Sequence, residues 1–110
     1  MTKKELREIC EKSAIGNDFG LMGMSLRPTS SADCEEKLTL IDYCGDVDRL
    51  DDSSSGKLFD NLLDIREKLI NSTKSAVELH KITKIHHFDE TTCGTLLVSF
   101  ILSIPFDDLE

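Results

Sequence analysis

The apolar residues of this chain change their spacing along the sequence, and each spacing predicts a different element. Over residues 3–15, Leu6, Ile9 and Cys10 recur at helical spacing with charged residues between them, which is typical of an amphipathic helix. Thr2 precedes this segment and an acidic residue follows it at the spacing of a capping box. The pattern therefore predicts a first helix over residues 3–15.

A longer apolar stripe predicts a second helix over residues 56–70. Aspartates in its first half and basic residues in its second half agree with the helix dipole. We expect Ser54 or Ser55 to cap its start and Asn71 to cap its end. The stripe consists of Leu58, Leu62, Ile65 and Leu69, and Phe59, Leu63 and Ile70 widen it.

The segments between these helices predict a first pair of strands. Residues 19–26 are largely apolar, and Pro28 ends that run. Residues 37–44 are dense in β-branched and aromatic side chains, which favours a strand. Together they form a hairpin with a loop of about nine residues. The second strand carries Leu38, Leu40, Asp42 and Cys44 on one side and Thr39, Ile41 and Tyr43 on the other.

The last third of the chain predicts a second hairpin, from about residue 76 to residue 105. Residues 75–88 fit either a prolonged helix or a strand with a bulge. Residues 95–106 decide for the strand, because they are almost continuously apolar, as in the central strand of a sheet. A turn over residues 89–94 joins the two runs, and Pro105 ends the last strand.

The resulting order is helix, strand, strand, helix, strand, strand, an αββαββ arrangement of the α+β class. A chain of 110 residues has room for one domain, residues 1–110. Two helices packed on one face of a four-stranded antiparallel sheet is the economical way to bury these elements.

The charge balance excludes some classes of partner. Twenty-one acidic residues stand against 13 basic ones, for a formal net charge of -8. Nucleic-acid backbones and anionic membrane surfaces both require a basic footprint, so neither is an expected partner. The first twelve residues are charged throughout and no apolar run approaches the length of a membrane span. We expect a cytoplasmic protein.

No metal, cofactor or catalytic motif is expected. If a calcium loop began at Asp46, the position that needs glycine would be Asp51 and the one that needs glutamate would be Lys57. The sequence contains no GxSxG, P-loop or HExxH motif, so we do not expect an enzyme. The cysteines lack CxxC spacing and are expected to be reduced thiols; they are Cys10, Cys34, Cys44 and Cys93.

The histidines also form a poor ligand set. In a strand, His86 and His87 would point to opposite faces, so they cannot easily share an ion with Cys93 in the turn. His80 lies six residues before His86 in the same segment. A cysteine nucleophile at Cys44 or Cys93 would need a base and an orienting group beside it, and no spacing in the sequence identifies them.

The acidic charge is concentrated, and this predicts a binding surface. Residues 33–52 carry a net charge of -6, and residues 66–84 carry +3. Residues 45–55 are predicted to be an exposed acidic loop. Such polarity speeds association with a basic partner, although acidity also serves solubility alone. The expected partner-binding residues are Asp42, Asp46, Asp48, Asp51 and Asp52.

Small acidic domains without catalytic motifs suit a non-enzymatic protein-binding module. We expect an inhibitor, an antitoxin or immunity protein, or an anti-defence protein, whose target is a protein with a basic surface. The active sites of nucleic-acid enzymes are of this kind, because they bind phosphates. The carboxylates of residues 45–55, which we call the acidic segment, would then substitute for those phosphates.

The chain also resembles class I type III secretion chaperones. The order of elements, the acidity and the tail over residues 96–109, LLVSFILSIPFDDL, carry the likeness, because a late strand of that family runs into a Pro-hydrophobic-Asp-Asp segment. The resemblance covers residues 3–15 and 38–109. It implies a homodimer that binds an unfolded effector segment on apolar patches. The chain departs from the family in lacking a third helix after that segment.

Overall fold

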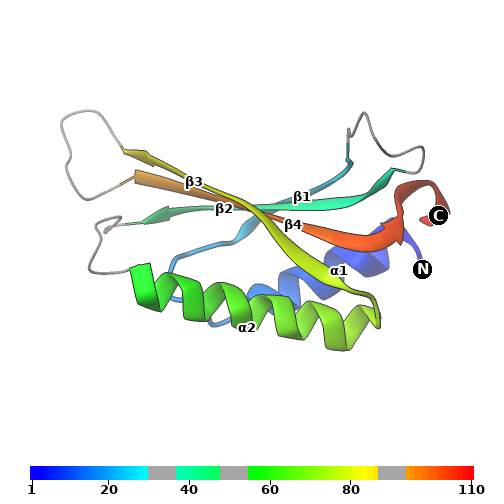
Figure 1. The fold of residues 1–110 in the computed structure, drawn as a ribbon, viewed down its shortest axis with the longest axis horizontal. Helices are drawn as coiled ribbons and strands as arrows, with labels where there is room; N and C mark the ends of the chain where they lie inside the picture. The colour runs from blue at the N-terminus through cyan, green and yellow to red at the C-terminus, as the bar shows by residue number, and fades with distance from the viewer. Residues whose placement is uncertain (30–36, 48–54, 87–93) are drawn as a thin grey trace.

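The computed structural model describes residues 1–29, 37–47, 55–86 and 94–110. Their elements follow the predicted αββαββ order and close with a turn of 3₁₀ helix over Phe106–Asp108 (Figure 1). The elements are α1 (Lys3–Ala14), β1 (Gly23–Pro28), β2 (Leu38–Val47), α2 (Ser55–Thr73), β3 (Val77–His86) and β4 (Gly94–Pro105).

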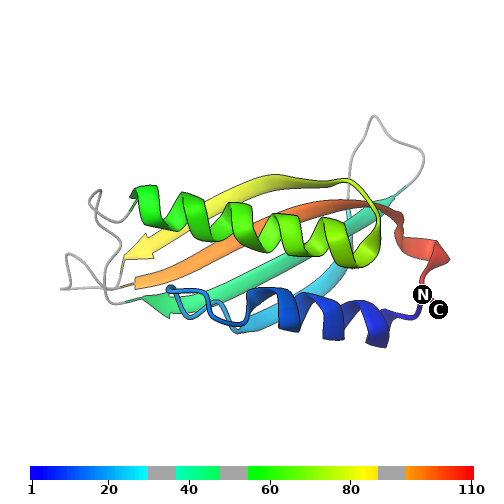
Figure 2. The ribbon, with the colours of Figure 1, turned by 90° about the horizontal axis from the view of Figure 1, so that it is seen from below.

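The strands form one antiparallel sheet of four, in the order β1-β2-β4-β3. Both helices lie on the same face of this sheet, α1 along the β1 side and α2 along the β3 side (Figures 1 and 2). The predicted α+β fold is therefore confirmed. Neither helix covers the opposite face, which we call the open face.

The core lies between the helices and the inner side of the sheet. Four inner side chains of the central strand β4 are fully buried, and Tyr43 of β2 is 1% exposed. The Tyr43 and Phe100 rings meet edge to face, with centroids 6.0 Å apart, a favoured aromatic geometry. β4 is thus central, as predicted, and its inner row is Leu96, Val98, Phe100 and Leu102.

Both predicted helices form, with their caps partly as expected. The Thr2 side chain accepts a hydrogen bond from the Glu5 amide at 3.0 Å, which caps α1. α2 runs past the expected C-cap Asn71 to Thr73, so that prediction was wrong. Lys74, with φ of 57°, takes the left-handed conformation that ends the helix, and its amide bonds to the Ile70 carbonyl at 2.9 Å.

The buried stripe of α2 is narrower than the sequence indicates. Leu58, Leu62, Ile65 and Leu69 are at most 5% exposed, as predicted, and Ile70 is half-buried. Phe59 and Leu63 are 51% and 44% exposed, so they do not widen the buried face. Only one flank of α2 contacts the sheet and α1, and these side chains lie outside it.

The first hairpin begins later and extends further than predicted. β1 starts at Gly23 instead of residue 19, because Gly20 has φ of 61°, which breaks an extended strand. β2 continues to Val47, so residues 45–47 are strand and not loop. A Cβ on Gly45 would collide with the Gly20 carbonyl, and the glycine therefore allows the chain before β1 to cross β2 closely.

The second hairpin agrees with the sequence. Residues 77–86 form a strand and not a helix, and β3 pairs with β4 along its length. The expected bulge falls between Leu79 and Lys81, at His80. Of the helices within the described ranges, neither is long and apolar enough to cross a membrane.

Replacement of Leu62 tests the core assignment. Because Leu62 is 1% exposed, Leu62→Ala should lower the free energy of unfolding by about 2–5 kcal/mol. The neighbouring Leu63→Ala is the matched control and should cost no more than about 0.5 kcal/mol. Denaturant titration of both variants measures this. Equal losses would contradict the orientation of α2.

Candidate functional site

Asp42, a predicted partner-binding residue, lies on the open face, where its carboxylate accepts hydrogen bonds from side chains of both neighbouring strands. Its Oδ2 accepts a hydrogen bond from Arg27 Nε at 2.6 Å, and its Oδ1 accepts one from Ser99 Oγ at 2.5 Å. These contacts join β1, β2 and β4 across the open face. The Asp42 side chain is 27% exposed. A partner that contacts Asp42 must share this carboxylate with Arg27.

Asp46 lies on the same face, near the end of β2. It is exposed, and its Oδ1 accepts a hydrogen bond from Thr95 Oγ1 at 3.0 Å. The strand rise separates it from Asp42 by about 13 Å. The other predicted residues, Asp48, Asp51 and Asp52, lie outside the described residues. The structure therefore places two of the five predicted carboxylates on one uncovered surface.

The described cysteines occupy opposite environments. Cys10 of α1 is fully buried, whereas Cys44 of β2 is exposed on the open face. Burial raises the pKa of the Cys10 thiol to about 12, so it is a poor nucleophile. Cys44 lies opposite Gly23 and Leu97, and neither of these neighbours can act as a base.

Two of the potential metal ligands of the second hairpin lie within the described ranges. His80 stands at the bulge of β3 and His86 at its end. His87 and Cys93 are outside the described ranges. Within those ranges, no group of three or more His, Cys, Asp or Glu side chains could hold an ion.

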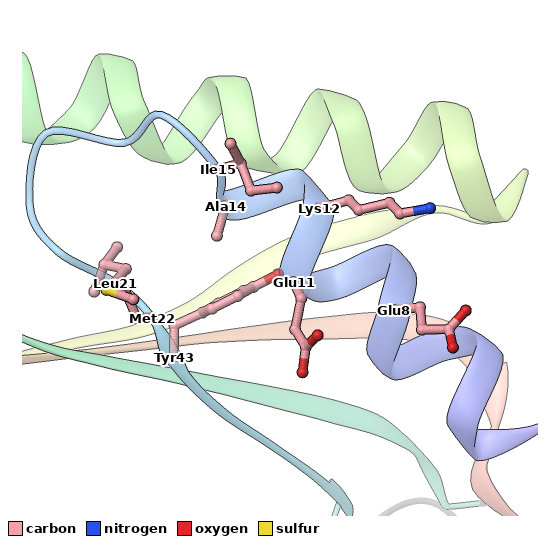
Figure 3. Close-up of a pocket in the computed structure, with 8 residues that line it drawn as sticks. All are labelled: Glu8, Glu11, Lys12, Ala14, Ile15, Leu21, Met22 and Tyr43. Carbon is pink, nitrogen blue, oxygen red and sulfur yellow. The ribbon is translucent and has the colours of Figure 1, made fainter.

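A pocket that the sequence did not predict opens between α1 and the chain that enters β1. It has a volume of about 360 Å³. Ala14, Leu21 and Tyr43 are its buried apolar residues. Figure 3 shows the Tyr43 side chain reaching from β2 toward α1, where its hydroxyl donates a hydrogen bond to the Cys10 carbonyl at 2.7 Å.

The rim of the pocket is both apolar and acidic. Ile15, which follows α1, and Met22, which precedes β1, line it and are 70% and 84% exposed. Glu8 and Glu11 line it from α1, together with Lys12. Figure 3 shows the Glu11 side chain projecting from α1.

The segment behind the rim is held by side-chain hydrogen bonds. Asn17 Oδ1 accepts from the Phe19 and Leu21 amides at 2.9 and 3.1 Å. Asn17 Nδ2 donates to the Ala14 carbonyl at 2.6 Å. Asn61 of α2 accepts from the Asp18 amide at 2.9 Å. The backbone that presents the rim is therefore tied to both helices.

The comparisons with known proteins give no relative for this chain. No family model, no curated protein and no solved structure matches it. The geometry of the open face and of the pocket is accordingly the basis for the proposals below.

The buried Cys10–Tyr43 pair predicts a loss of stability in alkali. Burial raises the pKa of Cys10 from 9.0 to about 12 and also raises the pKa of the Tyr43 phenol. The contribution of the neutral thiol and phenol to the free energy of unfolding is therefore fully present below pH 9. It is lost as the pH rises from 9 towards the pKa values of the folded state. The loss approaches about 1.4 kcal/mol per pH unit for each group.

Thermal melts between pH 8 and about pH 11 measure this effect. Cys10→Ala should flatten the decline above pH 9 relative to the native chain. Cys44→Ala, at an exposed position, is the control and should leave the slope unchanged. Identical slopes for the native chain and Cys10→Ala would show that the thiol is not buried as described.

Proposed function

We propose that this chain is a non-enzymatic protein-binding module of the inhibitor, antitoxin, immunity or anti-defence type, which acts on a partner with a basic surface. The observation that supports this most directly is the uncovered sheet face that presents Asp46 at the end of β2. Three further aspartates follow within six residues along the chain. Carboxylates at the end of a strand that is held by its neighbours are well placed to meet a basic surface.

The net charge supports the same proposal. A charge of -8 on 110 residues attracts a basic partner over a distance of about one Debye length. Asp46 keeps its carboxylate exposed while Thr95 orients it. In a nucleic-acid enzyme the partner surface would be its phosphate-binding site. The carboxylates would then occupy the positions of substrate phosphates and block the site.

The described cysteines also support a non-enzymatic role. A cysteine nucleophile needs a lowered pKa or an adjacent base. Burial raises the pKa of Cys10, and the cross-strand neighbours of Cys44 are not bases. Asp42 is itself bound to Arg27 and Ser99, so it does not serve as an orienting group for a histidine.

A second candidate function follows the likeness to secretion chaperones. Phe59 and Leu63 on α2 and Ile82 on the adjacent β3 are 51%, 44% and 38% exposed. An apolar patch of this kind fits a homodimer contact or the binding of an unfolded effector segment. In this alternative the partner is held by apolar contacts and not by charge.

Neutralisation of the acidic segment distinguishes the two functions. The change of Asp46, Asp48, Asp51 and Asp52 to Asn should slow association with a partner recovered by affinity capture. The melting temperature should change little, because exposed charges contribute little to stability. Stopped-flow or surface-plasmon measurements of the association rate at increasing salt provide the readout.

A second quadruple variant controls for the change in total charge. It carries Asp60→Asn, Glu67→Gln, Asp107→Asn and Asp108→Asn, all at exposed positions. This variant should keep the native association rate to within about twofold, since long-range attraction is screened. Equal slowing by both variants, or native binding by the first, would remove the acidic segment from the interface and favour the chaperone alternative.

A further inference from the structure

The pocket between α1 and β1 carries the most exposed apolar side chains of the described residues. Met22 is 84% exposed and Ile15 is 70% exposed, and both line the same pocket (Figure 3). Isolated exposed apolar residues are ordinary on a protein surface. Two of them lining one apolar pocket are more informative, because these side chains and the pocket expose apolar surface to water in one region.

These side chains are presented by a fixed backbone. The Asn17 side chain binds the Phe19 and Leu21 amides, and the Asp18 amide binds Asn61 of α2. The segment also packs closely on β2, because a Cβ on Gly45 would collide with the Gly20 carbonyl. Ile15 and Met22 are thus attached at both ends of a braced segment, so a ligand that covers them does not first have to order the backbone.

Charge at the rim indicates what kind of ligand fits. Glu8 and Glu11 are exposed and line the pocket, and neither forms an ion pair with another side chain of the described ranges. Lys12 lies on the same helix and leaves the rim with an excess of negative charge. An apolar pocket beside unpaired carboxylates complements an apolar side chain that has a basic neighbour.

We propose that this pocket binds a segment of the partner protein that inserts one large apolar side chain and places a lysine or arginine against Glu8 and Glu11. The inference rests on the proposed function as a protein-binding module, and it names a second contact beside the acidic end of β2. The apolar side chain packs on Tyr43 and Leu21 between Ile15 and Met22. The basic residue forms its ion pair at the rim.

Selection from a displayed library of random twelve-residue peptides tests this surface without knowledge of the partner. The full chain is the bait. Enriched peptides should carry Leu, Ile, Met or Phe within three positions of Lys or Arg. Failure to enrich any such pattern would overturn the proposal, since a preformed pocket with these properties selects for it.

Affinities of one selected peptide for surface variants place it on the protein. Met22→Asp and Ile15→Asp should each weaken binding by about tenfold or more, because each removes an apolar contact and adds a charge. The double variant Glu8→Gln with Glu11→Gln should weaken binding by a few-fold and reduce its salt dependence. All of these positions are exposed, so circular dichroism should show a native fold.

Matched controls lie on the other side of the molecule. Leu63→Asp and Glu67→Gln alter exposed positions of α2 and should leave peptide affinity within about twofold. Loss of binding in Leu63→Asp with native binding in Met22→Asp would assign the peptide to α2 and overturn the proposal. A dimer of the unliganded chain that Met22→Asp dissociates would make a second copy the occupant, and would also overturn it.

The pocket inference and the proposed function can fail independently, because different experiments test them. Peptide binding at the pocket tests the pocket alone. The association rate of the acidic-segment variant tests charge-steered binding. If the peptides fail while that variant still slows association with the captured partner, the pocket inference is wrong and the proposed function stands. If the peptides bind at the pocket and the variant associates normally, the pocket is a contact of a module that is not steered by the acidic segment.

Discussion

The hydrogen bond from Tyr43 to the Cys10 carbonyl joins α1 to the sheet beside the proposed binding pocket. The hydroxyl lies 2.7 Å from that oxygen, in a core where an unpaired phenol would cost about 1–3 kcal/mol. The same ring packs edge to face on Phe100 of β4. Tyr43 thereby fixes α1 relative to the centre of the sheet, and with it the pocket that opens beside α1.

The helices cover only one face of the sheet, and this determines which surfaces a partner could reach. The open face presents Asp42 and Asp46, and the α1 side presents the pocket. The sheet edges are less available. β3 carries a bulge and Lys81, and β1 is short and ends in Pro28. These features discourage the addition of a further strand.

Features that follow from the regular spacing of apolar residues could be predicted from the sequence. Leu62 and Leu69 follow the helical repeat, and the alternation around Ile41 assigns the faces of β2, so the element order and the layering were predictable. The bulge near His80 was also visible, because the apolar alternation of β3 changes phase there. These features arise from neighbours in the chain.

Features that depend on distant contacts were not predictable. Gly45 resembles the start of a loop, but the chain at Gly20 crosses over it, and pairing with Thr95 of β4 keeps Asp46 in the strand. Phe59 matches the stripe of α2 but lies outside its contact with the sheet. The pocket needs Ala14, Leu21 and Tyr43 from three separate segments. The only local signals for it were Asn17 and the glycine that follows three residues later.

A methyl NMR titration of the protein with its captured partner tests the account most directly. The proposed apolar contact lies at α1 and the entry to β1. The resonances of the Ile15 δ1 and Met22 ε methyl groups should therefore shift or broaden on addition of the partner, while the resonance of the Ile82 δ1 methyl group on β3 remains in place. Shifts confined to Ile82 and the exposed Leu63 of α2 would contradict this placement, because the partner would then bind along α2 and β3.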